Sequence, residues 1–107
     1  MPQPEGSTPA ERLATEFGMQ DGELAVGGVP LSTLAERYGT PLYVYDAGRM
    51  RASYRALGKA VAGFADIYYS IKANPNPAVA RVFVGEGAGL EIASAAEYIA
   101  ARTAGAT

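Results

Sequence analysis

The stretch of sequence that decides the fold is residues 66–93, DIYYSIKANPNPAVARVFVGEGAGLEIA. Residues 66–72 are rich in Ile and Tyr, which predicts a strand, and residues 90–93 predict a second short strand. Between them, Asn76 followed by Pro77 is typical of a helix start. A strand, a helix and a strand joined by short connections predict successive parallel βα units, and therefore an α/β fold.

The same pattern continues after the second strand. Ser94 and Glu97 have the spacing of a capping box that opens a last helix, and such a box forms without any ligand. Two βα units cannot close a sheet on themselves, and a (β/α)8 barrel takes about 250 residues. The chain has 107 residues and stops just after this helix, where another strand is expected. We therefore expect an incomplete domain.

Upstream of this stretch, smaller elements are predicted. Asp46 is placed to cap a helix over residues 47–62, and apolar side chains at helical spacing predict one buried stripe on it: Met50, Tyr54, Leu57 and Val61. Before this helix we expect a disordered lead at residues 1–7 and a helix from Pro9 to Gly18 with a Thr8–Glu11 capping box. A strand at 23–26 and a Gly27-Gly28 turn are expected next. They are followed by a helix at 34–38 with a Thr33–Glu36 capping box and a strand at 41–45.

Composition narrows the chemistry that the chain can perform. It contains no Cys and no His, so no disulfide and no metal site is predicted, and an acid–base site needs carboxylates, Lys or Tyr. The nine Lys and Arg residues are scattered and the net charge is -2, so no nucleic-acid partner is expected. Residues 1–8 lack the pattern of a secretory signal, and no apolar run approaches the roughly 20 residues of a membrane span. We therefore expect a cytoplasmic protein without membrane association.

Side-chain alternation indicates where the chemistry lies. Successive strand residues point to opposite faces, so Tyr68, Ser70 and Lys72 are predicted to point inward while the Ile residues between them pack against helices. Lys72 then lies at the carboxyl end of its strand, which is the edge where ligands bind in parallel α/β folds. On the second strand Glu91 is predicted to face inward as well, on the same side as Lys72.

A lysine at that edge has a chemical use. A side-chain amine with an ordinary pKa of about 10.4 is mostly protonated. Burial beside a ligand favours the neutral amine, which condenses with an aldehyde to give a Schiff base. The Glu91 carboxylate is then able to hold the ammonium group or move its proton. From position alone, however, a lysine at a strand end is more often solvated than functional.

Three segments resemble one enzyme family. Residues 69–77, YSIKANPNP, resemble the cofactor-lysine segment of the fold-type III pyridoxal-phosphate decarboxylases, the group of ornithine, diaminopimelate and arginine decarboxylases. Residues 87–97, GAGLEIASAAE, resemble that family's second barrel strand, and Glu97 falls on another of its acidic positions. Residues 28–46 resemble the N-terminal stretch of diaminopimelate decarboxylases, so the resemblance covers about residues 23–107.

The resemblance implies a pyridoxal 5'-phosphate cofactor, with Lys72 as the catalytic lysine that carries it and Glu91 as its cofactor-binding acidic neighbour. It implies the first βα units of an alanine-racemase-like (β/α)8 TIM barrel. The domains expected are an N-terminal lead and short helix at 1–22, a segment associated with a β-domain at 23–46, and the truncated barrel at 47–107. The implied reaction is decarboxylation of a small amino acid, most closely meso-diaminopimelate to lysine, by a homodimer with sites formed between subunits.

Several alternatives stay open. The family's phosphate loop, stacking His, acidic partner of the pyridine nitrogen and C-terminal domain are not among these residues, so we expect little activity from this chain alone. Glu91 stands where Asp is common and Ala95-Ala96 replace a Gly-bearing pair, which loosens the substrate assignment. A decarboxylase of a secondary-metabolite or polysaccharide cluster, a non-catalytic cofactor-binding protein and an inactive fragment are the alternatives. An amino-acid racemase is disfavoured, because Asn-Pro-Asn-Pro at 74–77 replaces the Ala-Tyr-Gly-His-Gly-like run of racemases.

Overall fold

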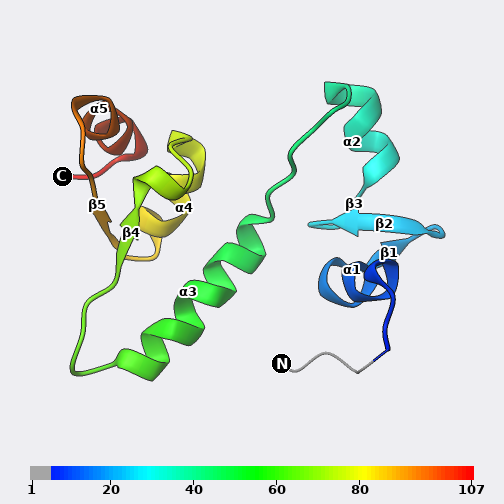
Figure 1. The fold of residues 1–107 in the computed structure, drawn as a ribbon, viewed down its shortest axis with the longest axis horizontal. Helices are drawn as coiled ribbons and strands as arrows, with labels where there is room; N and C mark the ends of the chain where they lie inside the picture. Colours follow the sequence, from blue (N-terminus) through cyan, green and yellow to red (C-terminus); the bar gives the residue numbers. More distant parts are fainter. Residues whose placement is uncertain (1–5) are drawn as a thin grey trace. The chain divides into compact units, whose positions relative to one another are not determined.

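The computed structural model describes residues 6–107 (Figure 1). Most of the disordered lead that we expected at residues 1–7 therefore lies outside the described residues. The chain divides into two compact units, Met1–Asp46 and Ala47–Thr107, which are described separately below. Within residues 6–107, no helix combines the length and the apolar character that crossing a membrane requires.

The first unit opens with the expected helix, α1 (Pro9–Phe17). Its capping box is formed in both directions, since the Glu11 amide donates to Thr8 Oγ1 at 3.2 Å and the Thr8 amide donates to Glu11 Oε2 at 2.7 Å. The helix ends at Gly18, whose φ of 102° is in the region that favours glycine. Local capping signals therefore placed both ends of this helix correctly.

A three-stranded antiparallel sheet follows, made of β1 (Met19–Gln20), β2 (Glu23–Val26) and β3 (Val29–Pro30) in that order. The strand expected at 23–26 is confirmed, and so is the turn after it, where Gly27 and Gly28 have φ of 59° and 78°. The sequence did not predict β1 and β3, because two residues are too few to show alternation. The first domain boundary that we expected, between residues 22 and 23, lies at the end of the turn that joins β1 to β2.

The helix expected at 34–38 exists, but it begins earlier, as α2 (Leu31–Tyr38). Pro30 occupies the cap position, so the predicted Thr33–Glu36 capping box is wrong. Glu23 of β2 takes over part of this role, since its carboxylate accepts hydrogen bonds from the Ser32 amide at 3.0 Å and the Ser32 hydroxyl at 2.5 Å. A cap supplied by another strand leaves no signal in the local sequence.

The strand expected at 41–45 is wrong in this structure. Residues 42–46 belong to no helix or strand, and the Tyr43 side chain is 88% exposed. A β-strand needs a hydrogen-bonded neighbour, and among residues 6–107 no strand lies against this segment. High β-propensity alone therefore gave the wrong prediction here.

The second unit contains two parallel strands and four helical segments: α3 (Ala47–Val61), β4 (Tyr68–Ser70), the 3-10 helix η1 (Ile71–Ala73), α4 (Pro77–Gly85), β5 (Gly89–Glu91) and α5 (Ala95–Ala104). β4 and β5 pair in parallel, with Tyr68 opposite Gly89 and Ser70 opposite Glu91. This arrangement confirms the α/β class and the parallel βα order. The strands are shorter than the expected ranges 66–72 and 90–93.

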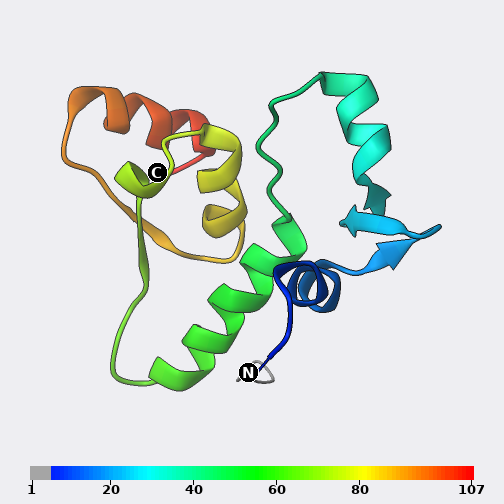
Figure 2. The same cartoon turned by 45° about the vertical axis from the view of Figure 1, so that its right-hand side comes forward.

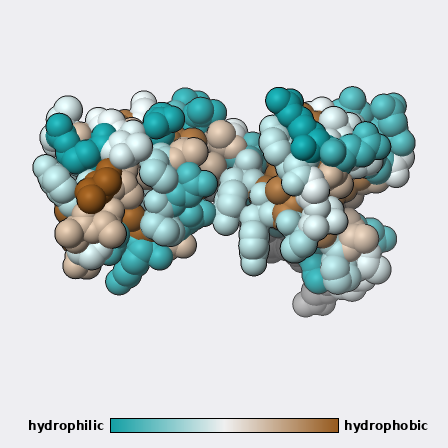
Figure 3. Space-filling view, turned by 90° about the horizontal axis from the view of Figure 1, so that it is seen from above, coloured by the Kyte–Doolittle hydropathy of each residue, from teal (hydrophilic) through white to brown (hydrophobic). Residues whose placement is uncertain are grey.

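Helices pack on one side of the two strands. α4 packs against α3, α5 and β5, and α5 packs against η1; α4 lies beside β4 in both ribbon views (Figures 1 and 2). The buried side chains of this unit come from η1, α4 and α5: Ile71, Val79, Ala80, Ala101 and Ala104. The buried stripe expected on α3 is formed only in part, since Met50, Tyr54 and Val61 are half-buried but Leu57 is 51% exposed. Apolar residues also appear among polar ones at the surface of this unit in Figure 3.

Candidate functional site

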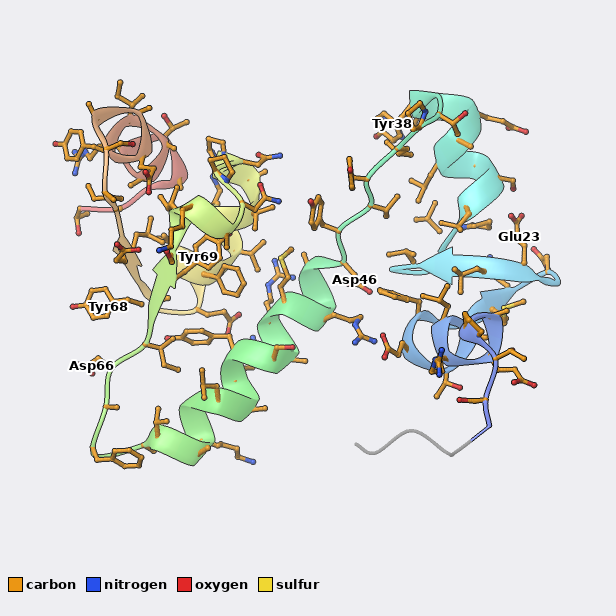
Figure 4. All side chains as sticks on the ribbon, in the orientation of Figure 1. Glu23, Tyr38, Asp46, Asp66, Tyr68 and Tyr69 are labelled. Carbon is orange, nitrogen blue, oxygen red and sulfur yellow. The ribbon has the colours of Figure 1, made fainter. Side chains whose placement is uncertain are left out.

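Two neighbouring tyrosines mark the two faces of β4: one face is covered by helices, and the other, called the bare face below, is left uncovered. Tyr68 and Tyr69 point to opposite sides of the strand (Figure 4). The Tyr69 ring stacks on Phe83 of α4 with 4.5 Å between ring centroids, and its hydroxyl donates to the Asn74 carbonyl at 3.0 Å. Tyr68 is 66% exposed. The alternation predicted from the sequence is therefore confirmed for these two residues, and the Tyr68 face is the one that the helices leave uncovered.

The bare face carries a carboxylate near the carboxyl ends of both strands. Ser70 and Glu91 are register partners, and the Ser70 hydroxyl donates to Glu91 Oε2 at 2.5 Å. One register step earlier, a Cβ added to Gly89 would lie 2.3 Å from Tyr68 Cε1, so the tyrosine ring covers the glycine. A ring, a hydroxyl and a carboxylate therefore share this face, with the polar groups at the carboxyl end.

Lys72 lies just beyond the end of β4, in η1, rather than in the strand itself as the sequence predicted. Strand alternation therefore does not set its direction. The turn that carries it is fixed on both sides, because Ile71 is fully buried and the Tyr69 hydroxyl bonds the Asn74 carbonyl. Lys72 itself is exposed. Across residues 6–107, the Glu91 carboxylate has its hydrogen bond from Ser70 and forms no ion pair with Lys72.

The Asn residues after Lys72 shape the turn. The Asn76 amide donates to Asn74 Oδ1 at 3.0 Å, and the Ala78 amide donates to Asn76 Oδ1 at 2.9 Å, which caps α4 with Pro77 in its first turn. The helix start predicted at Asn76-Pro77 is confirmed. Both amide side chains therefore hold the backbone in place and are not directed at a ligand by these contacts.

Glu97 is engaged at the start of α5. Its amide donates to Ser94 Oγ at 3.1 Å, and its carboxylate accepts from the Ser94 hydroxyl at 2.8 Å and from the Ala93 amide at 3.3 Å. The predicted cap by Ser94 is confirmed, but the reciprocal bond of a capping box is displaced by one residue, since the Glu97 carboxylate accepts from the Ala93 amide and not from the Ser94 amide.

An ion pair that the sequence did not reveal lies on the helical side. Arg55 of α3 binds Glu86 in a two-bond arrangement of 2.7 and 2.9 Å, with Arg51 at 3.7 Å from the same carboxylate. The Arg55 hydrogen bonds lower the pKa of Glu86, against a smaller opposing effect of desolvation. Glu86 lies between α4 and β5, so this contact ties α3 to the connection that leads into β5. Partners 31 residues apart leave no periodic signal in the sequence.

Residues 47–107 match the family model described as "Pyridoxal-dependent decarboxylase, pyridoxal binding domain". The chain belongs to this family. Among its relatives, the diaminopimelate decarboxylase of Pseudomonas aeruginosa is 44% identical over 82 residues, 76% of this chain and 20% of that protein. That of Methanothermobacter thermautotrophicus is 42% identical over 87 residues, 78% of this chain and 20% of that protein. The crystal structure of AQ1208 from Aquifex aeolicus matches with a TM-score of 0.79 and 37% identity, over 91% of this chain and 24% of its own. The chain thus spans about a fifth of the length of the curated relatives it matches.

The residues of the bare face fit the cofactor of this family. Pyridoxal phosphate bears an aldehyde, and the protein group that condenses with an aldehyde is a primary amine. The chain has two lysines, and Lys72 is the one at the carboxyl end of a parallel strand. The glycine at position 89, covered by an aromatic ring, and the carboxylate of Glu91 lie on the face beside it. The donor set therefore suits a pyridoxal-binding domain.

Proposed function

We propose that this chain carries the cofactor lysine of a pyridoxal-phosphate-dependent amino-acid decarboxylase, with meso-diaminopimelate as the substrate and lysine as the product. The observation that carries the proposal is the place of Lys72: it sits in a fixed turn at the carboxyl end of β4, beside the Ser70–Glu91 pair. That edge of a parallel sheet is where ligands bind. The names of the relatives support diaminopimelate as the substrate.

We also propose that β4 and β5 are the first strands of an alanine-racemase-like (β/α)8 barrel over residues 47–107, and that residues 23–46 join a β-domain. Exposed apolar side chains support this proposal, since Ile92 after β5 is 38% exposed and Ile99 of α5 is 65% exposed. An open hollow of about 680 Å³ beside β5, lined in part by these elements, leaves room for a neighbouring unit. The homodimer and the cytoplasmic location expected from the sequence belong to the same proposal.

The roles of the residues follow from their positions. Lys72 Nζ would hold the cofactor before the substrate arrives and again after the product leaves. Bound pyridoxal phosphate supplies the electron-accepting ring that takes up the electron pair left by the departing carboxyl group. The Glu91 carboxylate, held by Ser70, presents negative charge on the cofactor face at the carboxyl end of β5. Tyr69 and Ile71 keep the Lys72 turn in place, which contributes orientation to the reaction.

Carbon dioxide release tests the proposed reaction. The longest polypeptide of the gene that contains this chain is incubated with pyridoxal phosphate and carboxyl-labelled meso-diaminopimelate, ornithine or arginine, and labelled carbon dioxide is counted. We expect release from diaminopimelate, and its loss in Lys72→Arg but not in the matched variant Lys59→Arg. Release from a different amino acid only would contradict the substrate assignment, and equal activity of both variants would contradict the role of Lys72.

A related decarboxylase acting on another amino acid is the second candidate. The observation that favours it is Glu91, which stands where the family commonly has Asp and reaches across to Ser70. The same substrate panel separates the two candidates.

A further inference from the structure

We propose that Ser70 is a positioning residue that holds the Glu91 carboxylate away from Lys72 and so keeps the lysine amine free to react. The inference rests on the proposed function of Lys72 and adds to it a residue that controls its state. The Glu91 carboxylate is hydrogen-bonded to a neutral hydroxyl, that of Ser70, and Lys72 follows Ser70 by two residues along the chain.

Glu91 and Lys72 are close enough to pair if nothing prevents it. Strand neighbours are about 4.8 Å apart and residues rise about 3.3 Å each along a strand. Glu91 lies opposite Ser70, two residues before Lys72, so the Cα atoms of Glu91 and Lys72 are about 11 Å apart at most on these values, whichever way the chain turns after Ser70. Two long flexible side chains span that distance. The ion pair is therefore accessible to the chain, and the structure has the carboxylate on Ser70 instead.

The Ser70 hydroxyl is available to bond Glu91 because it makes no capping hydrogen bond to the backbone of η1. Ser70 occupies the cap position of η1, where a serine ordinarily bonds the backbone amides of the helix start, yet it makes no side-chain cap bond. Its hydroxyl reaches across to β5 instead, with a donor–acceptor distance of 2.5 Å to Glu91 Oε2. A hydroxyl donating to a carboxylate at such a distance is a strong, charge-assisted bond.

The other charged side chains on the element packed against η1 have partners of their own. On α5, the Glu97 carboxylate accepts the Ser94 hydroxyl and the Ala93 amide, and Arg102 donates to the Ala106 carbonyl at 2.9 Å. Glu91 is thus the carboxylate whose position decides whether Lys72 is paired. A paired ammonium holds its proton more tightly, and a protonated amine does not attack an aldehyde.

Competitive labelling of the two lysines of the 107-residue chain tests the inference. Trace acetic anhydride is added, and the ratio of acetylated Lys72 to acetylated Lys59 is measured by peptide mass spectrometry. Ser70→Thr and Ser70→Val form a matched pair, because they have nearly the same shape and only threonine keeps the hydroxyl. We expect Ser70→Thr to keep the original ratio and Ser70→Val to lower it about two- to fivefold at low salt, the range of an exposed ion pair.

The double variant Ser70→Val/Glu91→Gln tests whether the effect of Ser70→Val depends on the charge of Glu91. It lacks both the hydroxyl and the charge, so we expect the ratio to return to that of the unchanged chain. Added salt is expected to restore the ratio in Ser70→Val, because screening weakens the new ion pair. Circular dichroism of each variant checks that the fold is kept, and a general loss of structure would not reverse with a second substitution or with salt.

The outcomes separate this inference from the proposed function. The same chains are treated with pyridoxal phosphate and borohydride. If the unchanged chain is labelled selectively on Lys72 while the valine and threonine variants give equal acetylation ratios, the role of Ser70 is overturned and the cofactor assignment stands. If the longest polypeptide of the gene that contains this chain shows no preference for Lys72, the proposed function fails, while the acetylation ratios still decide the role of Ser70 by themselves.

Discussion

A methyl group added at position 89 probes the bare face of the sheet. The Cβ of Gly89→Ala would lie 2.3 Å from Tyr68 Cε1 and 2.4 Å from Cδ1, whereas carbon atoms in contact are about 3.5–4.0 Å apart. Gly89 is not among the glycines with positive φ, so the backbone accepts alanine without strain. The Tyr68 ring is therefore the obstacle, and it must leave its place over residue 89.

Two opposing contributions set the size of the effect. Overpacking costs about 1–3 kcal/mol, and the low end applies because the Tyr68 ring is 66% exposed and can swing into solvent. Replacing glycine by alanine also restricts the unfolded chain, which stabilises by about 0.4–1 kcal/mol. We expect these contributions nearly to cancel, with a net loss of at most about 0.6 kcal/mol for Gly89→Ala. With Tyr68→Ala already present, the clash is absent, and the same substitution is expected to stabilise by about 0.4–1 kcal/mol.

Urea denaturation followed by far-ultraviolet circular dichroism measures the four chains of this cycle. Gly85→Ala in α4 is the matched control, because a Cβ there meets no atom within 4 Å and φ is not positive, so it is expected to stabilise in both backgrounds. Destabilisation by Gly89→Ala of the same size with and without the Tyr68 ring would refute the reasoning.

Three further perturbations test the contacts around the site. Because the pKa of Glu86 is lowered, its stabilising contribution is complete above the ordinary value of 4.5 and is lost as the pH falls through the lowered value; Glu86→Gln is therefore expected to flatten the acid limb of a stability–pH profile, and an unchanged limb would contradict this. Tyr69→Phe keeps the ring stacking but removes the hydrogen bond to the Asn74 carbonyl. We expect the free energy of unfolding to fall by about 1 kcal/mol and amide hydrogen exchange in residues 71–76 to become faster. Unaltered exchange there would contradict the role of this hydrogen bond in holding the Lys72 turn. Ser94→Ala removes the cap of α5 and is expected to cost about 1 kcal/mol in urea denaturation, with Ser94→Asp as the variant that keeps a cap; equal stabilities of the two variants would argue against capping.

Local signals in the sequence predicted much of the second unit. The start of α4 follows from Asn76 and Pro77, and the start of α5 from Ser94 and Glu97, because a cap involves residues within one helical turn. The opposite directions of the two tyrosines on β4 follow from strand alternation alone. Features that depend on three or four neighbouring residues were therefore within reach of the sequence.

Features that depend on partners far apart in the chain could not be predicted from the sequence. The segment 41–45 has the composition of a strand but no strand beside it within residues 6–107. β4 ends at Ser70 and the chain then turns into η1. The expected strand ran two residues further, to Lys72, so strand alternation was wrongly applied to the direction of that side chain. The bond between Ser70 and Glu91 joins residues 21 apart, and it became visible only with the register of the two strands.

The central claim is that Lys72 is the cofactor lysine, and borohydride trapping tests it most directly. The longest polypeptide of the gene that contains this chain is incubated with pyridoxal phosphate, reduced, digested and mapped by mass spectrometry, and the labels on the two lysines of residues 1–107 are compared. We expect selective pyridoxyl labelling of Lys72, with Lys59 on α3 labelled little. Equal labelling of both lysines, or of neither, would contradict it.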